Sequence, residues 1–136
     1  MRILTTFAAV AGLLAMTGCS PLEQKARDTA AALSGSIVAA QAQYQTSCAA
    51  NPKQEVCQLI NRGVAGENAL ITAVETYCGW APTNPSAPNA GAPGAPTTAA
   101  PPDPTATCVP VKSAQAALQA AIANATALTL EIKGAI

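Results

Sequence analysis

Three long segments of this chain carry apolar or small residues at alternating steps of three and four positions. They span residues 22–47, 52–78 and 111–132. This spacing places a narrow apolar stripe along one side of a helix, so each segment is predicted to be a helix with one buried side. The third stripe is the most regular, with Val111, Ala114, Leu118, Ala121, Ala125, Leu128 and Ile132. Because one such helix cannot bury its stripe alone, the three are expected to pack together.

A proline-rich segment separates the second predicted helix from the third. Residues 80–110 hold nine of the eleven prolines. Proline lacks an amide hydrogen and disrupts both helices and sheets, so this segment is expected to be an extended loop. The connection between the first two helices is short. The sequence therefore predicts an all-α fold, an up-down-up three-helix bundle with a long Pro/Ala-rich loop between helices two and three.

Several residues are predicted to mark the helix ends. Asn51 is the expected N-cap of the second helix, with Pro52 in its first position. Gly79 is expected to end that helix and Gly134 to end the third. Glu67 falls on or beside the second stripe, and we expect it at the edge of the bundle with its carboxylate reaching solvent; a functional buried carboxylate is the alternative.

The N-terminus has the features of an export signal. Arg2 precedes a mostly apolar stretch at residues 3–16, and Thr17, Gly18 and Cys19 follow. The apolar stretch is shorter than the roughly 20 residues that a membrane-spanning helix needs. It fits the apolar region of a signal peptide. Small residues directly before a cysteine resemble the lipobox, the processing site of bacterial lipoproteins.

The resemblance covers residues 1–20 and implies a lipid anchor. In lipoproteins the segment before the cysteine, here residues 1–18, is removed, and Cys19 would receive a diacylglycerol and usually an N-acyl chain such as palmitate. Met16 departs from the Leu that the family prefers. Several acyl chains bind a bilayer far more strongly than one. Ser20, where Asp would retain a lipoprotein in the inner membrane, implies the outer membrane, with the protein facing the periplasm. The alternative is an ordinary secretory signal with an incidental cysteine.

These features divide the chain into four parts. We expect a lipoprotein signal peptide at 1–18, a lipid-anchored helical hairpin at 19–79, the loop at 80–110, and the third helix of the same bundle at 111–136.

Four cysteines remain for the mature chain, and an even number in an exported protein predicts two disulfides. Cys57 and Cys78 lie on one predicted helix, about 32 Å apart, which excludes their pairing and with it Cys48–Cys108. Pairing Cys48 with Cys78 would join opposite ends of the bundle. The expected disulfides are therefore Cys48–Cys57 and Cys78–Cys108.

The composition excludes several functional classes. A formal net charge of zero argues against a nucleic-acid-binding protein. The chain has no histidine, and we find no phosphate-binding loop, nucleophile motif or metal-ligand cluster in it. We therefore expect no catalytic residues, no cofactor, no metal site and no enzymatic activity. Trp80, the only tryptophan, is expected to cover the bundle end with Tyr77; contact with the lipid interface is the alternative.

The expected function is that of a small membrane-anchored lipoprotein of the bacterial cell envelope with a structural or protein-interaction role. Its expected partners are the membrane, through the lipid on Cys19, and an envelope protein or a second copy of the chain. An alternative is an apolar-ligand or lipid-binding module with space between helices at Gly35, Gly63 and Gly66. A role in lysis or toxin release is a further alternative.

Overall fold

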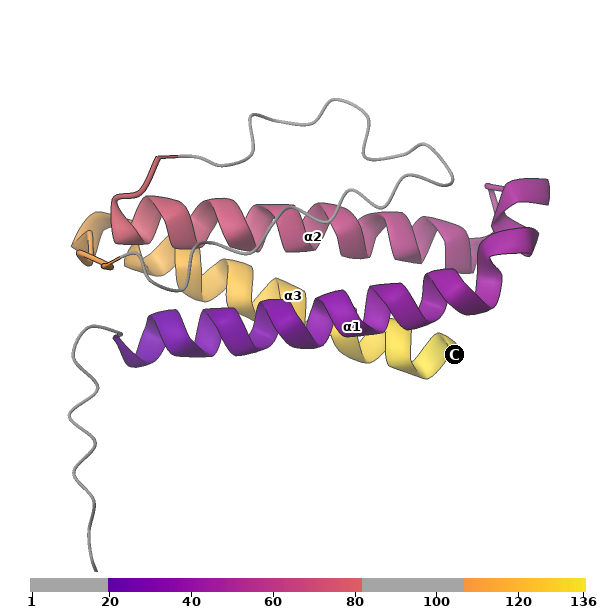
Figure 1. Cartoon of the computed structure of the whole chain (residues 1–136), viewed down its shortest axis with the longest axis horizontal. Coiled ribbons are helices and arrows are strands. Elements are labelled where there is room, and N and C mark those ends of the chain that lie inside the picture. Colours follow the sequence, from indigo (N-terminus) through magenta and orange to yellow (C-terminus); the bar gives the residue numbers. More distant parts are fainter. Residues whose placement is uncertain (1–19, 82–106) are drawn as a thin grey trace, which may run out of the picture.

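The protein is a bundle of three helices in the computed structural model, which describes residues 20–81 and 107–136. The helices are α1 (Pro21–Ala50), α2 (Glu55–Cys78) and α3 (Gln115–Ala135), and a single 3-10 turn, η1 (Lys112–Ala114), precedes α3. All three helices contact one another, and the described residues include no strand (Figure 1). The predicted all-α class and the packing of three helices are confirmed. Most of the predicted Pro/Ala-rich loop lies outside the described residues.

The start of α1 follows directly from its first residues. Ser20 is the N-cap, and its hydroxyl oxygen accepts a hydrogen bond from the backbone amide of Glu23 at 3.2 Å. Pro21 takes the first helical position, where its missing amide hydrogen costs nothing. Glu23 places a negative charge in the first turn, where the helix dipole favours it.

The corner between α1 and α2 differs from the prediction. α1 continues past the expected end at residue 47, and the amide of Asn51 donates to the carbonyl of Ser47 at 2.9 Å. Asn51 therefore ends α1, and the prediction that it caps α2 is wrong. Its side-chain oxygen instead accepts from the amide of Lys53 at 3.3 Å, Pro52 lies in the turn, and Gln54 precedes α2. Asn51 cannot complete one helix and begin the next at the same time.

Gly79 ends α2, as predicted. It has a left-handed backbone conformation with φ of 68°. Its amide donates to the carbonyl of Thr76 and the amide of Trp80 donates to that of Glu75, the two bonds of a Schellman motif. The prediction that Gly134 ends the third helix is wrong, because α3 continues through it to Ala135. The Ala135 carbonyl accepts a hydrogen bond from the Tyr44 hydroxyl at 2.9 Å.

The core forms where the three apolar stripes meet. Its largest fully buried apolar side chains come from all three helices, and they are Leu33, Ile37, Leu70, Leu118 and Ile132. Two glycines of α2 bring α3 close. A Cβ atom on Gly63 would lie 2.8 Å from Cδ1 of Ile132, and one on Gly66 would collide with the side chain of Leu128. The room left by these two glycines is therefore filled by core side chains.

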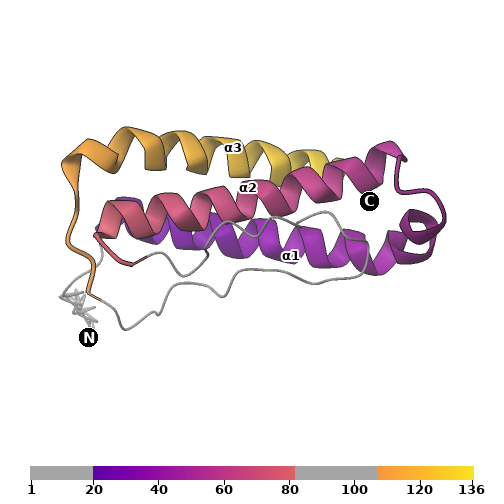
Figure 2. The ribbon, with the colours of Figure 1, turned by 90° about the horizontal axis from the view of Figure 1, so that it is seen from above.

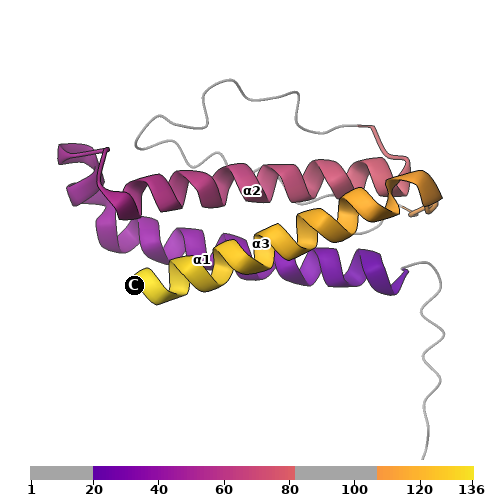
Figure 3. The same ribbon diagram turned by 180° about the vertical axis from the view of Figure 1, so that it is seen from behind.

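Figures 1 and 2 show the three helices lying lengthwise against one another, and specific contacts join their ends. At one end, which we call the Ser20 end, the Ser20 and Tyr77 hydroxyls lie 3.1 Å apart, and a disulfide links Cys78 at the end of α2 to Cys108 just before η1. At the other, the Tyr44 end, Tyr44 near the end of α1 bonds to the end of α3. Figure 3 shows the same two ends from behind.

Candidate functional site

The four cysteines form the two predicted disulfides. Cys48 bonds to Cys57 with their Cα atoms 5.6 Å apart, and Cys78 bonds to Cys108 with their Cα atoms 4.4 Å apart. The first bond ties the end of α1 to the start of α2. The second ties the end of α2 to the segment that leads into α3. Cys19, the predicted lipidation residue, lies outside the described residues.

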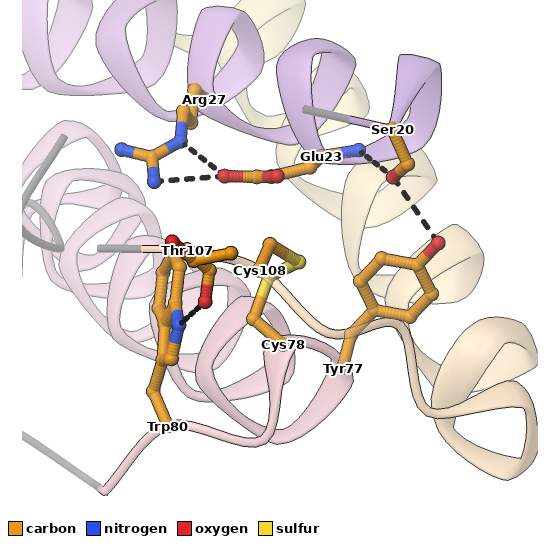
Figure 4. Close-up of polar contacts among 8 residues, drawn as sticks. All are labelled: Ser20, Glu23, Arg27, Tyr77, Cys78, Trp80, Thr107 and Cys108. Atoms are coloured by element: carbon orange, nitrogen blue, oxygen red, sulfur yellow. Dashed lines mark hydrogen bonds and ion pairs between the residues drawn. A yellow bond between two sulfur atoms is a disulfide. The ribbon is translucent and has the colours of Figure 1, made fainter. Parts of the chain in front are cut away.

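A group of polar and aromatic side chains gathers around the second disulfide at the Ser20 end (Figure 4). It draws on the first turns of α1, the last turn of α2 and the residues just before η1. We call this group the Glu23 cluster. Its members are Ser20, Glu23, Arg27, Tyr77, Cys78, Trp80, Thr107 and Cys108. It contains Glu23, one of the buried carboxylates of the described residues.

An ion pair lies at the centre of the Glu23 cluster. The Glu23 side chain is fully buried, and its Oε1 accepts from Nε of Arg27 at 2.9 Å and lies 2.8 Å from Nη2 of the same guanidinium. The guanidinium also lies over the Trp80 ring, 5.3 Å from its centroid. The guanidinium offsets the large cost of removing the Glu23 carboxylate from water. The aromatic face favours the same cation.

The aromatic residues of the cluster fasten separate segments together. The Trp80 indole donates a hydrogen bond to the Thr107 carbonyl at 2.9 Å, and its half-buried ring packs against the core. Tyr77 is buried, with its hydroxyl at Ser20. Both side chains thus cover the bundle end, as expected of them.

Backbone groups before η1 complete the end of α2. The last carbonyls of a helix lack partners within the helix. Here the amide of Val109 donates to the Cys78 carbonyl at 3.3 Å, and the amide of Val111 donates to the Tyr77 carbonyl at 2.7 Å. These two bonds and the Cys78–Cys108 disulfide hold the segment at a defined position on the end of the bundle.

The Glu23 cluster contains the atom types of a metal site, but its cysteines are not in the thiolate form that binds metals. A Glu23 carboxylate oxygen and the sulfur atoms of Cys78 and Cys108 all lie within 4.8 Å of one another. Cysteine binds metals as the thiolate. In this structure the two sulfurs are bonded to each other, so Glu23 alone offers an anionic ligand. The cluster is therefore built to hold segments together.

Glu67 is placed differently from the prediction. Its residue is 4% exposed, so the expectation that its carboxylate reaches solvent is wrong. It lies three residues after Val64 and four before Ile71, both buried, and therefore faces the same side of α2. Burial raises the pKa of the Glu67 carboxyl, and a hydrogen bond with Ser34 on α1 opposes that shift.

Two further buried carboxylates, Glu23 and Glu75, are absent from the sequence-based expectations. A signal for Glu23 exists, because a serine followed three residues later by a glutamate is typical of a helix start, and Arg27 lies one turn beyond it. Glu75 has no comparable signal. It follows Val74 of the second stripe, and the structure leaves it only 1% exposed.

Comparisons with protein families, with curated proteins and with solved structures find no match to this chain. In the described part of the chain, no helix has the length and apolarity needed to cross a bilayer.

Proposed function

We propose that this protein is a small lipoprotein of the bacterial cell envelope, anchored through acylated Cys19, with a structural or protein-interaction role. The observation that carries the proposal is the position of the first helix cap. Ser20, the residue directly after Cys19, is the N-cap of α1. Cleavage before Cys19 would therefore leave the described bundle intact and place the acyl chains one residue from its first helix.

The proposal includes the arrangement of the bundle and its location. Contacts of Ser20 with Tyr77 and of Tyr44 with Ala135 support the up-down-up order of the helices, with the Pro/Ala-rich segment leading from α2 to α3. Two disulfides suit an oxidising compartment outside the cytoplasm. Ser20 in place of Asp favours delivery to the outer membrane, facing the periplasm.

A non-enzymatic role agrees with the chemistry of the Glu23 cluster. Its carboxylate is paired with Arg27, its sulfurs are joined in a disulfide, and its tyrosine and tryptophan bond to other segments. These groups stabilise the bundle end. The ligand-binding alternative loses part of its basis, because Leu128 and Ile132 fill the room beside Gly66 and Gly63.

The lipid anchor is tested by the mass and the location of the protein. The unaltered chain, produced in a Gram-negative host, should appear in the membrane fraction with the mass of residues 19–136 plus the acyl groups. Cys19→Ala should lack the acyl mass. An unmodified mass for the unaltered, membrane-associated protein would contradict the proposal.

Ser20→Asp is a matched variant for the location. Aspartate is as good an N-cap as serine, so the start of α1 should be preserved. The variant should keep its acyl mass and its helical circular dichroism but move from the outer-membrane to the inner-membrane fraction. An unchanged distribution would contradict the proposed outer-membrane sorting without affecting the anchor.

The interaction role is tested by crosslinking in intact cells. A discrete partner captured by the unaltered protein and lost with Cys19→Ala would support an anchored interaction module. Crosslinks between copies of the chain alone would support a self-associating structural protein.

A further inference from the structure

We propose that the Ser20 end of the bundle docks on the membrane that holds the anchor, with the side chains of Val109 and Val111 inserted at the lipid surface. This inference depends on the proposed lipid anchor and adds a second, non-covalent contact with the bilayer. The partner that we propose for this end of the bundle is a lipid surface.

The first observation is the exposure of two apolar side chains at this end. Val109 is 68% exposed and Val111 is 38% exposed. Both belong to the segment just before η1, at the end of the molecule where α1 begins and α2 ends (Figure 2). These side chains offer apolar surface that contact with lipid would remove from water.

The second observation is that these valines are held in place. Their amides bond to the last carbonyls of α2, and the neighbouring Cys108 is fixed to Cys78 by a disulfide. A segment held in this way loses little conformational freedom on binding, because its backbone is already ordered.

The third observation is that Tyr77 connects Val111 to the residue next to the predicted anchor. The Val111 amide lies 2.7 Å from the Tyr77 carbonyl oxygen, and the Tyr77 hydroxyl lies 3.1 Å from the Ser20 hydroxyl. Cys19 directly precedes Ser20 in the chain. A bilayer that receives the acyl chains of Cys19 therefore meets this end of the bundle first, which identifies it as the occupant of the apolar surface.

The charge beside the valines suits the same occupant. Lys112 follows Val111 directly and is exposed. A basic side chain next to inserted apolar groups is favoured at a bilayer, because it attracts anionic headgroups.

Leu130 provides a matched control within the same protein. It is 66% exposed, nearly the same as Val109, but it lies near the end of α3, five residues before the Ala135 that bonds to Tyr44. It shares the apolar character and the exposure of Val109 and differs in its distance from the anchor.

The test places a single fluorescent reporter at each end. Trp80 is the only tryptophan, so Trp80→Phe with Val109→Trp leaves one reporter at the Ser20 end, and Trp80→Phe with Leu130→Trp leaves one at the Tyr44 end. Each acylated protein is reconstituted into phosphatidylcholine and phosphatidylglycerol vesicles that contain lipids brominated near the headgroup end of the acyl chains. Bromine quenches tryptophan emission at close range.

We expect loss of emission from the tryptophan at position 109 and unchanged emission from that at position 130. Unchanged emission from both, in protein whose acyl mass is confirmed, would overturn the docking and leave the lipid anchor standing. Equal quenching of both would also overturn it, because the bundle would then lie on its side. Absence of the acyl mass would overturn both proposals.

A second experiment keeps Trp80, in case its replacement disturbs the fold. Trp80 lies at the Ser20 end and is half-buried, so brominated lipid should quench it in the unaltered protein. Val109→Asp with Val111→Asp should reduce this quenching, whereas Leu130→Asp should not. Undiminished quenching in the double variant, with acyl mass and helicity unchanged, would show that the valines do not hold the end on the membrane and would overturn the inference.

Discussion

Gly79 has a backbone conformation that disfavours any side chain. Its φ of 68° places it in the left-handed region, which costs other residues about 1–2 kcal/mol. A Cβ atom there would have ordinary contacts, with its closest neighbours 3.9 Å away, so the cost arises from the backbone alone. The Schellman motif that ends α2 depends on this conformation.

Gly79→Ala should therefore lower the free energy of unfolding by about 1 kcal/mol. Gly35→Ala should raise it by about 1 kcal/mol, because Gly35 lies within α1 with nothing within 4 Å of its added Cβ, and alanine favours helix. Urea unfolding of both variants beside the unaltered protein measures the two changes. If both substitutions changed the free energy of unfolding in the same direction, the backbone conformations of Gly79 and Gly35 would not explain the changes.

Glu67 should make the stability depend on pH. Burial raises its pKa in the folded protein above the ordinary value of 4.5, so between these two pKa values the folded state binds more protons than the unfolded state. The contribution of Glu67 to stability is then fully present below the ordinary pKa and is lost as the pH rises through the folded pKa. Each unit of the shift corresponds to about 1.4 kcal/mol.

Glu67→Gln should consequently be more stable than the unaltered protein at neutral pH, and the difference should disappear as the pH falls toward 4.5. Urea unfolding at a series of pH values measures it. Glu55→Gln, an exposed position on the same helix, controls for the loss of one negative charge. If the free energy of unfolding of both variants changed with pH in the same way, burial of Glu67 would not be the cause of the difference.

The two disulfides should contribute unequally to the free energy of unfolding. The Cys48–Cys57 bond spans 9 residues of sequence and the Cys78–Cys108 bond spans 30. Each bond reduces the entropy of the unfolded chain, which stabilises the folded protein by about 3 and about 4 kcal/mol respectively. The second bond also positions the amides that complete the end of α2.

Replacement of both cysteines of each pair by alanine tests this difference. Loss of Cys78–Cys108 should lower the free energy of unfolding by at least about 1 kcal/mol more than loss of Cys48–Cys57. Urea unfolding of the two double variants gives the comparison. A larger loss from the first pair would show that the corner between α1 and α2 matters more than the Ser20 end.

The helices and the disulfides were predictable from the sequence because both depend on local rules. Apolar spacing defines a helix face, and the length of a helix excludes some cysteine pairings. The corner at Asn51 was not predictable, because the same residue suits the end of one helix and the start of the next, and the packing of α1 decides between them.

The Glu23 cluster could be predicted only in part for a similar reason. The local pattern from Ser20 to Arg27 indicates a helix start with an ion pair. Burial of that pair depends on Trp80 and Cys108, which come from other segments. The prediction for Glu67 was wrong because a charged residue on a stripe is usually at its edge, whereas here Glu67 is buried and bonds to Ser34 of α1.

The proposed docking depends on a short connection between the anchor and the bundle. Insertion of roughly 20 Gly/Ser residues between Cys19 and Ser20 would add a flexible span of about 25 Å. Ser20 would still cap α1, so the free energy of unfolding should not change. Quenching of the tryptophan at position 109 by brominated lipid should fall. Unchanged quenching would mean that Val109 and Val111 hold the docked end without help from the short connection.

The length of α1 sets a height above the membrane. Its 30 residues extend about 45 Å at 1.5 Å per residue. With the Ser20 end on the bilayer and the bundle standing on it, the corner closed by Cys48–Cys57 would lie at roughly that elevation. Neighbours in the envelope would then be selected by how far they reach toward the lipid, and the protein would serve as a spacer of fixed length.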